Sequence, residues 1–321
     1  MGVITREQLV LSADAYEASV AAGGVVDTYC SSLPWIDAAL TAFAPNALPF
    51  VIQTDSGFAP LALRAGSLRW VAPWEASWGL TSAMVGADMD RLAGDVVDEL
   101  LARRADWDAL FLSGLARHGA AFQGLVRRLH GRFRLGASSP SARCVASLDG
   151  GADGFLARRS PKFRKSLRQA ERANDGRIAF LVERNVGPAR AAEIYAAILA
   201  IEALSWKGRE GVGITDGPMR VFYGEMIPRL AAAGRLRVTW ATVEGVKVGY
   251  VLGGVFGDSY RGLQFSFDAT YAELSVGNLM QWATIRALCD EGIAHYDLGS
   301  EMEYKLRWAE RRVESVALVV R

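Results

Sequence analysis

The sequence has little cysteine and little histidine for its 321 residues. The three cysteines, Cys30, Cys144 and Cys289, are far apart and form no CxxC pair, and bridging any two would leave one thiol over, which favours a reducing compartment. The three histidines stand apart from any second ligand at the spacing that zinc sites use. We therefore expect a cytoplasmic protein without a metal.

Further absences narrow the class of protein. No apolar run approaches the roughly 20 residues that a transmembrane helix needs, and the N-terminal stretch carries early charges instead of the apolar core of a signal peptide. The chain has neither the GxSxG turn of many hydrolases nor a Walker phosphate loop. Since 36 Lys and Arg nearly balance 35 Asp and Glu, no overall basic field favours DNA, although a local patch would suffice for tRNA.

What is present indicates a large folded core. A content of 51% hydrophobic residues over this length favours two domains. The cluster of Asp and Gly at 149–154 interrupts both helix and strand patterns and predicts the boundary between them. The expected domains are therefore 1–150 and 151–321.

Hydrophobic periodicity predicts an α/β order that recurs in the two halves. The first half has a helix at 31–44, strands at 48–54 and 59–73, a helix at 88–107, a strand at 108–115, a helix at 120–133 and a strand at 141–148. The second half has a basic helix at 161–175, a strand at 176–184, helices at 187–206 and 217–233, three strands within 235–268, a helix after 275, a strand at 294–299, a short helical segment at 301–310 and a strand at 313–320. The resulting fold class is α/β with mixed sheets.

The turn that opens the helix after residue 275 carries no charged side chain: it reads Ser275-Val276-Gly277-Asn278. Ser and Asn are ordinary N-cap residues, so one interpretation is a helix start without a ligand. The other is that free backbone N–H groups, supported by the helix dipole, bind an anion such as a pyrophosphate. Leu279 and the apolar residues after it would pack this helix between layers, with its N-terminus aimed at a strand end.

The order of the second half resembles the GNAT acyltransferase fold, and the stretch 267–308 resembles the C-terminal signature of the CelD-like branch of that superfamily. The pieces that carry this resemblance are Phe267-Asp268, Ser275 with Gly277, Tyr296-Asp297-Leu298-Gly299, and Tyr304-Lys305 followed by Trp308. The segments 50–70, 160–172 and 201–214 also resemble that branch, so the likeness spans most of the chain. Members of the branch are associated with cellulose and other exopolysaccharides.

The resemblance implies two tandem GNAT-like domains, an architecture similar to that of the Fem-type aminoacyl transferases. It also implies an acyl-CoA donor, acetyl-CoA or a longer acyl-CoA. The donor-binding residues expected at the turn that opens the helix after residue 275 are Ser275, Val276, Gly277, Asn278 and Leu279. Lys305 is a further candidate for a donor phosphate; the alternatives are a contact to an acidic acceptor and an ordinary solvated lysine. The superfamily's usual Arg/Gln-x-x-Gly-x-Gly/Ala turn is altered, because Ala272 stands first and Ser275 takes the place of the earlier glycine.

Acyl transfer to an amine requires a base for the ammonium proton, a donor for the tetrahedral oxyanion and an acid for the leaving thiolate. Tyr304 resembles in position the tyrosine that many GNAT enzymes place near the leaving sulfur, and it is the candidate acid; the alternative is a packed, half-buried tyrosine. Asp268 and Glu202 are the candidate bases, directly or through water. Their alternatives are a turn cap and an ordinary helix-surface acid.

Three further residues are expected on the substrate side. Trp206 and Lys207 precede the glycine-punctuated stretch GREGVG and are interpreted as a substrate-binding loop, since a tryptophan offers a flat face to a sugar or a nucleobase. The alternative is a packed anchor of the loop. Asp297 is expected to orient loop amides beside the substrate. The basic run 158–184 is either a solvated helix face or a contact for a phosphate-rich acceptor such as a nucleotide sugar, a lipid-linked glycan or a tRNA acceptor stem.

The leading hypothesis is an acyl-CoA-dependent N-acyltransferase, most simply an N-acetyltransferase. Its acceptor would be an amino sugar or similar amine, free or linked to a lipid or nucleotide, on the path to a cell-surface exopolysaccharide. A second hypothesis keeps the fold and takes an amino acid from charged tRNA, as Fem-type enzymes do. A third is a non-catalytic sensor whose donor site binds a regulatory nucleotide or nothing.

Overall fold

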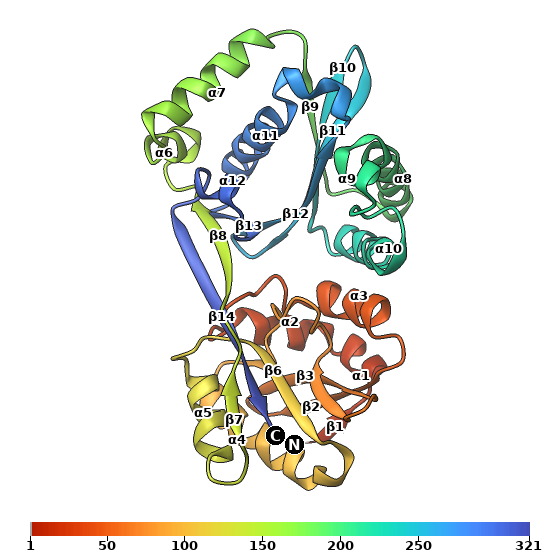
Figure 1. The fold of residues 1–321 in the computed structure, drawn as a ribbon, viewed down its shortest axis with the longest axis vertical. Helices are drawn as coiled ribbons and strands as arrows, with labels where there is room; N and C mark the ends of the chain where they lie inside the picture. The colour runs from red at the N-terminus through yellow and green to blue at the C-terminus, as the bar shows by residue number, and fades with distance from the viewer. Residues whose placement is uncertain (1) are drawn as a thin grey trace. The chain divides into compact units, whose positions relative to one another are not determined.

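The computed structural model describes residues 2–321 and divides the chain into two compact units. Unit 1 runs to Ala142 and also contains Val313–Arg321, whereas unit 2 is Arg143–Arg312. The chain therefore leaves unit 1, builds unit 2 and returns its last strand to unit 1 (Figure 1). The domain division at residue 150 stays a prediction.

Unit 1 is a mixed sheet covered by helices. Its strands are β1 (Gly2–Ile4), β2 (Leu48–Thr54), β3 (Gly57–Arg64), β4 (Trp70–Pro73), β5 (Val85–Gly86), β6 (Ala109–Leu115), β7 (Leu135–Ala137) and β14 (Arg311–Val320). The sheet has the order β1-β2-β3-β4-β6-β14, with β5 on β3 and β7 on β14. Of these described strand pairs, β4 and β6 are parallel and the others antiparallel. Its helices are α1 (Arg6–Leu11), α2 (Ala13–Ala21), α3 (Leu33–Phe43), α4 (Met89–Ala102), the 3-10 turn η1 (Arg104–Asp106) and α5 (Ala120–Leu129).

The core of unit 1 forms where the apolar face of α4 meets the sheet. Leu92, Val96 and Leu100 recur at helical spacing on α4 and are buried. They belong to one apolar cluster with β-strand residues that include Leu112 of β6 and Leu318 of β14. The last strand of the chain is thus a structural part of this core.

Unit 2 is a second mixed sheet with helices on both faces. Its strands are β8 (Ser141–Ser147), β9 (Ala179–Arg184), β10 (Leu236–Val243), β11 (Val246–Phe256), β12 (Ser259–Phe267) and β13 (His295–Ser300), in the order β8-β13-β12-β11-β10-β9. Only β12 and β13 pair in parallel. Its helices are α6 (Gly151–Ala157), α7 (Pro161–Ala173), α8 (Pro188–Leu204), α9 (Trp206–Glu210), α10 (Gly217–Ala232), the 3-10 segment η2 (Ala269–Leu274), α11 (Val276–Asp290) and α12 (Glu303–Leu306).

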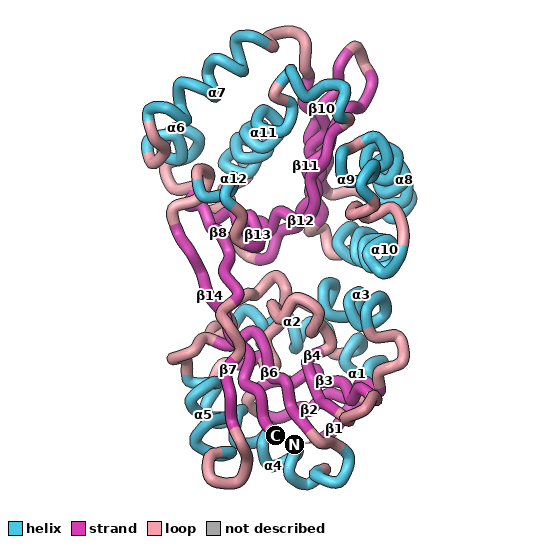
Figure 2. The backbone as a smooth tube through the Cα atoms, in the orientation of Figure 1, coloured by secondary structure: helices cyan, strands magenta, loops and turns pink. Residues whose placement is uncertain are grey.

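Helix α11 is the central helix of unit 2. Figure 2 shows it between the strands β9–β12 and the helix pair α6 and α7, with α8, α9 and α10 on the opposite side of the strands. Its residues Met280 and Val276 pack in an apolar cluster against β10 and β11, while Trp282 and Ile285 pack in another that includes Phe155 of α6. The helix is therefore held between two layers, as its two apolar faces predict.

Two local expectations are wrong. The Asp and Gly cluster at 149–154 contains only a short turn, because Gly150 takes a positive φ of 74° and α6 begins at the next residue. The stretch after Ser205, expected as a loop, starts with the helix α9, since the Ser205 side chain accepts a hydrogen bond from the Gly208 N–H and caps it.

The core position of β14 leads to a testable expectation. Leu318 is 1% exposed, so Leu318→Ala should destabilise unit 1 by about 2–5 kcal/mol through lost burial and a residual cavity. Amide hydrogen exchange would show the lost protection in unit 1. The control Val319→Ala, at a partly exposed neighbouring position of the same strand, should cost less. Equal effects of the two variants would contradict this view of the strand.

Candidate functional site

The site begins where β12 and β13 separate. These strands pair over three positions only, Ser259 to Arg261 on β12 with His295 to Asp297 on β13. Leu263 of β12 is skipped in the register with β11, which places a bulge just past the last of these pairs. Within residues 2–321, β12 then continues to Phe267 without pairing to β13. The result is an open strand edge, and ligands in α/β sheets bind in such openings at the ends of parallel strands.

A cavity of about 580 Å³, which we call the main hollow, lies at this opening. Its lining residues are Trp206, Lys207, Val212, Val251, Gly262, Leu263, Gln264, Phe265, Ser266, Phe267, Gln281, Tyr296, Leu298, Met302, Tyr304 and Lys305. Four of the residues singled out from the sequence, Trp206, Lys207, Tyr304 and Lys305, are thus brought together although they come from segments about a hundred residues apart.

A smaller cavity of about 300 Å³, the turn hollow, connects this region to the start of α11. Its lining residues are Phe265, Phe267, Ala272, Ser275, Gly277, Asn278, Gln281, Tyr304, Arg307 and Trp308. Phe265, Phe267, Gln281 and Tyr304 line both hollows. The glycine turn and the candidate acid Tyr304 therefore line the same cavity, the turn hollow.

A third cavity of about 600 Å³ runs along α7 and is called the α7 groove. Its lining residues are Ser160, Lys162, Phe163, Ser166, Leu167, Gln169, Ala170, Ala173, Asn174, Glu273, Ser275, Asn278, Arg307 and Trp308. It shares Ser275, Asn278, Arg307 and Trp308 with the turn hollow. The turn at the start of α11 thus lies where two cavities meet.

The first backbone N–H groups of α11 have no hydrogen-bond acceptor in the described chain. Ser275 has φ 54° and ψ 29°, the left-handed conformation that glycine adopts without strain, and its side chain makes no hydrogen bond to the helix. The first hydrogen bond of α11 runs from the Leu279 N–H to the Ser275 carbonyl oxygen at 3.2 Å. Among the described residues, nothing accepts from the N–H groups of Val276, Gly277 and Asn278. Their partial positive charge is available to an anion.

Gly277 is required for space. A Cβ at this position would lie 3.1 Å from the Phe265 ring and 3.2 Å from the Phe267 ring. Both rings also line the turn hollow. A side chain at residue 277 would therefore displace the two phenyl rings that shape the cavity.

Unit 1 also has a helix, α4, between the parallel strands β4 and β6, and carboxylates accept hydrogen bonds both in the loop after β4 and at the start of α4. Glu75 is 1% exposed and accepts hydrogen bonds from the N–H groups of Trp78, Leu80 and Thr81 at 2.6, 3.2 and 3.3 Å. Asp88 caps α4 with its own carboxylate. An anionic ligand would meet these carboxylates in unit 1, whereas the turn of unit 2 carries no such charge.

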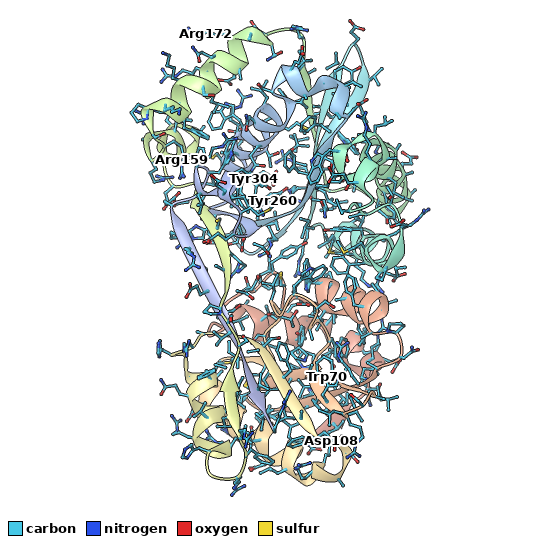
Figure 3. The ribbon with its side chains drawn as sticks, viewed as in Figure 1. Trp70, Asp108, Arg159, Arg172, Tyr260 and Tyr304 are labelled. Carbon is cyan, nitrogen blue, oxygen red and sulfur yellow. The ribbon has the colours of Figure 1, made fainter. Side chains whose placement is uncertain are left out.

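Tyr304 lies on the short helix α12, beside β12 and β13 (Figure 3). It is 43% exposed and lines both the main hollow and the turn hollow. Partial burial raises the pKa of its phenol. The phenol therefore stays protonated at neutral pH and is available as a proton donor.

Lys207 connects α9 to β12 across the main hollow. Its Nζ donates hydrogen bonds to Gln264 Oε1 and to the Phe265 carbonyl oxygen, each at 2.9 Å. Burial lowers the pKa of this ammonium group, while the nearby Glu202 carboxylate opposes the shift. Trp206, next to it in α9, is 53% exposed and keeps much of its ring free.

Lys305 follows Tyr304 and also lines the main hollow. Its Nζ donates to the Ser300 carbonyl oxygen at 2.9 Å. Burial, and next to it the positive charge of Arg261, lowers the pKa of Lys305 to about 8. A substantial fraction of this amine is therefore neutral at pH 8, and the group can gain or lose a proton under working conditions.

Glu202 does not line the hollows. It is fully buried in α8, and its Oε2 accepts a hydrogen bond from the Tyr250 hydroxyl at 2.8 Å. Its Oε1 has no hydrogen-bond partner within residues 2–321. Burial, followed by the negative charge of Glu202, raises the pKa of the Tyr250 phenol. Tyr250 stands opposite Ser266, which lines the main hollow, so Glu202 is separated from the hollow by this pair.

The two candidate aspartates also lie outside the three cavity linings. Asp268 caps η2, since its Oδ1 accepts from the Thr270 N–H at 2.9 Å and the Thr270 hydroxyl at 2.8 Å. Asp297 accepts hydrogen bonds from the buried Arg143 and Arg261. Its Oδ1 accepts from the Gly299 N–H at 2.7 Å; because both residues belong to β13, Asp297 orients an amide of this strand and not of a loop, next to Leu298 of the main hollow.

Sequence reasoning did not single out Gln281, Tyr296 and Arg307 as site residues. Gln281 and Tyr296 line the main hollow, and burial raises the pKa of the Tyr296 phenol. Arg307 donates to Asn278 Oδ1 at 2.9 Å, so it reaches the turn from the end of α12. The polar Gln281 within the apolar pattern of α11 is the one signal that could have indicated an inward-facing group.

Metal sites and membrane-spanning helices are both absent from residues 2–321. They contain no group of three or more His, Cys, Asp or Glu side chains placed to hold a metal ion. None of their helices combines the length and apolar character needed to span a bilayer.

Comparison with known proteins supports the fold and the second unit in particular. Residues 161–306 match the family described as "Acetyltransferase (GNAT) domain". No curated protein matches the sequence. The match covers α7 to α12, which contain the open turn and most of the residues that line the three cavities.

Several solved structures share the architecture over nearly the whole chain. FemX matches with a TM-score of 0.63 at 13% identity, over 99% of this chain and 97% of its own. L-PGS from Bacillus licheniformis matches with 0.55 at 12%, over 95% and 90%. A tandem GNAT protein from the clavulanic acid biosynthesis pathway matches with 0.51 at 10%, over 99% and 97%. At these identities the likeness shows the fold, which confirms the predicted mixed α/β, tandem GNAT-like architecture.

Residues 161–306 thus resemble a GNAT acetyltransferase domain, and the chain shares a mixed α/β, GNAT-like fold with these solved structures.

The lowered pKa of Lys305 can be measured directly. With lysines labelled by ¹³C-methylation, one resonance should titrate near pH 8, and it should be missing from the Lys305→Arg variant. The physical reason is that burial disfavours the charged ammonium form. If the resonance that disappears in Lys305→Arg titrates instead near the ordinary lysine value of about 10.4, the described environment of this amine is wrong.

Proposed function

We propose that the protein is an acyl-CoA-dependent N-acyltransferase, with acetyl-CoA as the simplest donor. The observation that supports this proposal is the turn hollow, whose lining contains Tyr304 together with Gly277 and Asn278, two residues whose N–H groups have no acceptor among the described residues. A pyrophosphate at these amides would receive charge-assisted hydrogen bonds and the favourable end of the α11 dipole.

The donor would then extend along β12. The pantetheine arm of CoA is a narrow chain with amide groups, and β12 offers backbone N–H and C=O groups on the edge that β13 leaves open after Arg261. The thioester would lie in the main hollow, within the region lined by Tyr304 and Lys305. Leu279 is a buried residue of the first turn of α11 and anchors the start of this helix in the core.

The chemistry uses the groups that line the main hollow. The acceptor amine attacks the thioester carbonyl carbon, and its ammonium proton passes to a base. Lys305 would take this proton, a role supported by its lowered pKa of about 8 and by its position in the lining of the main hollow. The C–S bond of the tetrahedral intermediate then breaks, and the Tyr304 hydroxyl donates its proton to the leaving thiolate. Solvent returns a proton to the tyrosinate, and Lys305 releases the proton that it took up.

In this scheme the carboxylates of Glu202 and Asp268 do not contact the substrate and act only through neighbouring residues. Glu202 would influence the hollow through Tyr250 and Lys207, because its carboxylate is buried behind them. Asp268 would hold the turn between β12 and α11 in shape through its bonds to Thr270. Asp297 would act on the substrate through the end of β13, which it fixes by its bond to Gly299.

The acceptor is proposed to be an amino sugar or similar amine for a cell-surface exopolysaccharide, which fits the CelD-like resemblance of the sequence and a cytoplasmic location. Trp206 supports this assignment because its half-free ring lines a hollow that also contains Lys207. Flat aromatic faces of this kind stack on sugar rings.

A second candidate is transfer of an amino acid from charged tRNA. The outer side of α7 favours it, since Lys165, Arg168 and Arg172 lie outside the lining of the α7 groove and form a basic stripe along the helix. Figure 3 shows Arg172 at the far end of this helix. This candidate changes the donor but keeps the fold and the hollow.

Donor binding gives the first test of the proposal. Calorimetric titration with acetyl-CoA should show saturable binding to the wild-type chain. Gly277→Ala should weaken it by about tenfold, because the added methyl group meets Phe265 and Phe267 at the turn. Gly187→Ala, which adds the same group in open space before α8, is the matched control and should bind normally.

Absence of binding at millimolar acetyl-CoA would contradict the proposed donor. If charged tRNA bound under the same conditions, the second candidate would take its place. If neither bound, a sensor with another ligand would be favoured.

Removal of the proposed acid gives the second test. Tyr304→Phe should lower kcat by about 100-fold with little change in the KM for acetyl-CoA, because the hydroxyl acts on the leaving thiolate. Tyr271→Phe, which alters another tyrosine of unit 2 outside the three hollows, should keep its activity. Steady-state kinetics that show unchanged kcat for Tyr304→Phe would remove this residue from the mechanism.

A further inference from the structure

The α7 groove is a cavity for which the proposed chemistry has no role. Its volume of about 600 Å³ is close to the 580 Å³ of the main hollow. The groove lies between α7 and the turn that opens α11. Ser275 and Asn278 line both the groove and the turn hollow. A diphosphate bound at this turn has two ends, and when one end points toward Tyr304 the other points into the groove.

The surface of the groove combines an apolar floor with polar sides. Phe163 and Trp308 pack edge to face with ring centroids 4.8 Å apart, and with Leu167 they supply the floor. Ser166 and Gln169 stand exposed on α7 at the rim. A flat heteroaromatic ring with hydrogen-bonding edges suits such a surface better than a flexible apolar chain does.

The charges of the groove indicate a phosphate. Lys162 lies at the first turn of α7 and lines the groove, and it makes no hydrogen bond or ion pair among residues 2–321. Arg307 enters from the other side and uses one N–H group for Asn278, which leaves the rest of its guanidinium for a ligand. Glu273 is the one acidic residue among the described lining.

Helix α7 has one face that lines the groove and an outer face that does not. Lys162 and Ser166 are one turn apart and both face the groove, whereas Lys165 does not line it. Both lysines are exposed and neither has a partner within the described part of the chain. The chain therefore provides two similar lysines on α7, one that lines the groove and one that does not.

We propose that the α7 groove binds the nucleoside end of the donor, with the 3′-phosphate of its adenosine held between Lys162 and Arg307. This inference rests on the proposed acyl-CoA function and assigns a subsite that the acyl transfer itself does not need. The base lies on the floor formed by Phe163 and Trp308, and the diphosphate stays at the turn. The groove fixes the far end of the donor and so contributes affinity without touching the thioester.

The test compares donors with and without the 3′-phosphate. Calorimetry with CoA and 3′-dephospho-CoA should give about tenfold tighter binding of CoA to the wild-type chain, as a charge-assisted contact predicts. Lys162→Met should remove most of this preference, and the matched control Lys165→Met should keep it. Turnover of acetyl-pantetheine, which lacks the nucleotide, should be the same in all three proteins.

The outcomes separate this inference from the function on which it rests. Equal affinities of the wild-type chain for CoA and 3′-dephospho-CoA, or equal effects of the two lysine substitutions, would overturn the groove assignment and leave the acyl-CoA function standing. A loss of acetyl-pantetheine turnover in Lys162→Met would also overturn it, because a role in the fold or in catalysis would then explain the variant. Failure of the wild-type chain to bind either form of CoA would overturn both.

Discussion

The separation of β12 from β13 is the constraint on which the site depends. Two parallel strands that paired along their whole length would satisfy each other's backbone groups and leave no room between them. Here the pairing stops after Arg261 and Asp297, and the bulge at Leu263 lies next to the last pair. The open edge of β12 and the main hollow result from this early end. The buried ion pairs of Asp297 with Arg143 and Arg261 fix β13 where the strands begin to part.

Packing of α11 places the turn at its N-terminus beside this opening. Apolar contacts on both faces hold the helix, and they fix the position of its N-terminus near the strand ends. Ser275 takes a left-handed conformation that glycine would adopt more easily, and the amides after it stay without acceptors in the described chain. In unit 1 the start of helix α4 is capped by the Asp88 carboxylate, which accepts a hydrogen bond from the Arg91 N–H. The start of α11 has no side-chain cap.

Much of this arrangement could be predicted from the sequence because it is local. The periodicity of α11, the strand order around it and the turn at Gly277 are all properties of short segments. The grouping of Trp206 with Tyr304 depended on the resemblance to a known family, which carries long-range information that periodicity lacks.

Other features depended on tertiary packing and could not be predicted. A glutamate in an amphipathic helix gives no local sign that it will be buried, so the enclosure of Glu202 behind Tyr250 was not foreseen. The return of β14 to unit 1 was missed because an apolar strand does not specify which sheet it joins. The α7 groove was missed because its walls are about a hundred residues apart in sequence.

The central claim is that the first amides of α11 bind the diphosphate of an acyl-CoA. The most direct measurement is ¹H–¹⁵N NMR of the labelled protein during titration with CoA, followed at the amides of Val276, Gly277 and Asn278. The account predicts saturable downfield shifts of these three protons, as new hydrogen bonds to phosphate oxygens form. Saturable shifts confined to other parts of the chain, with these three amides unmoved, would contradict it.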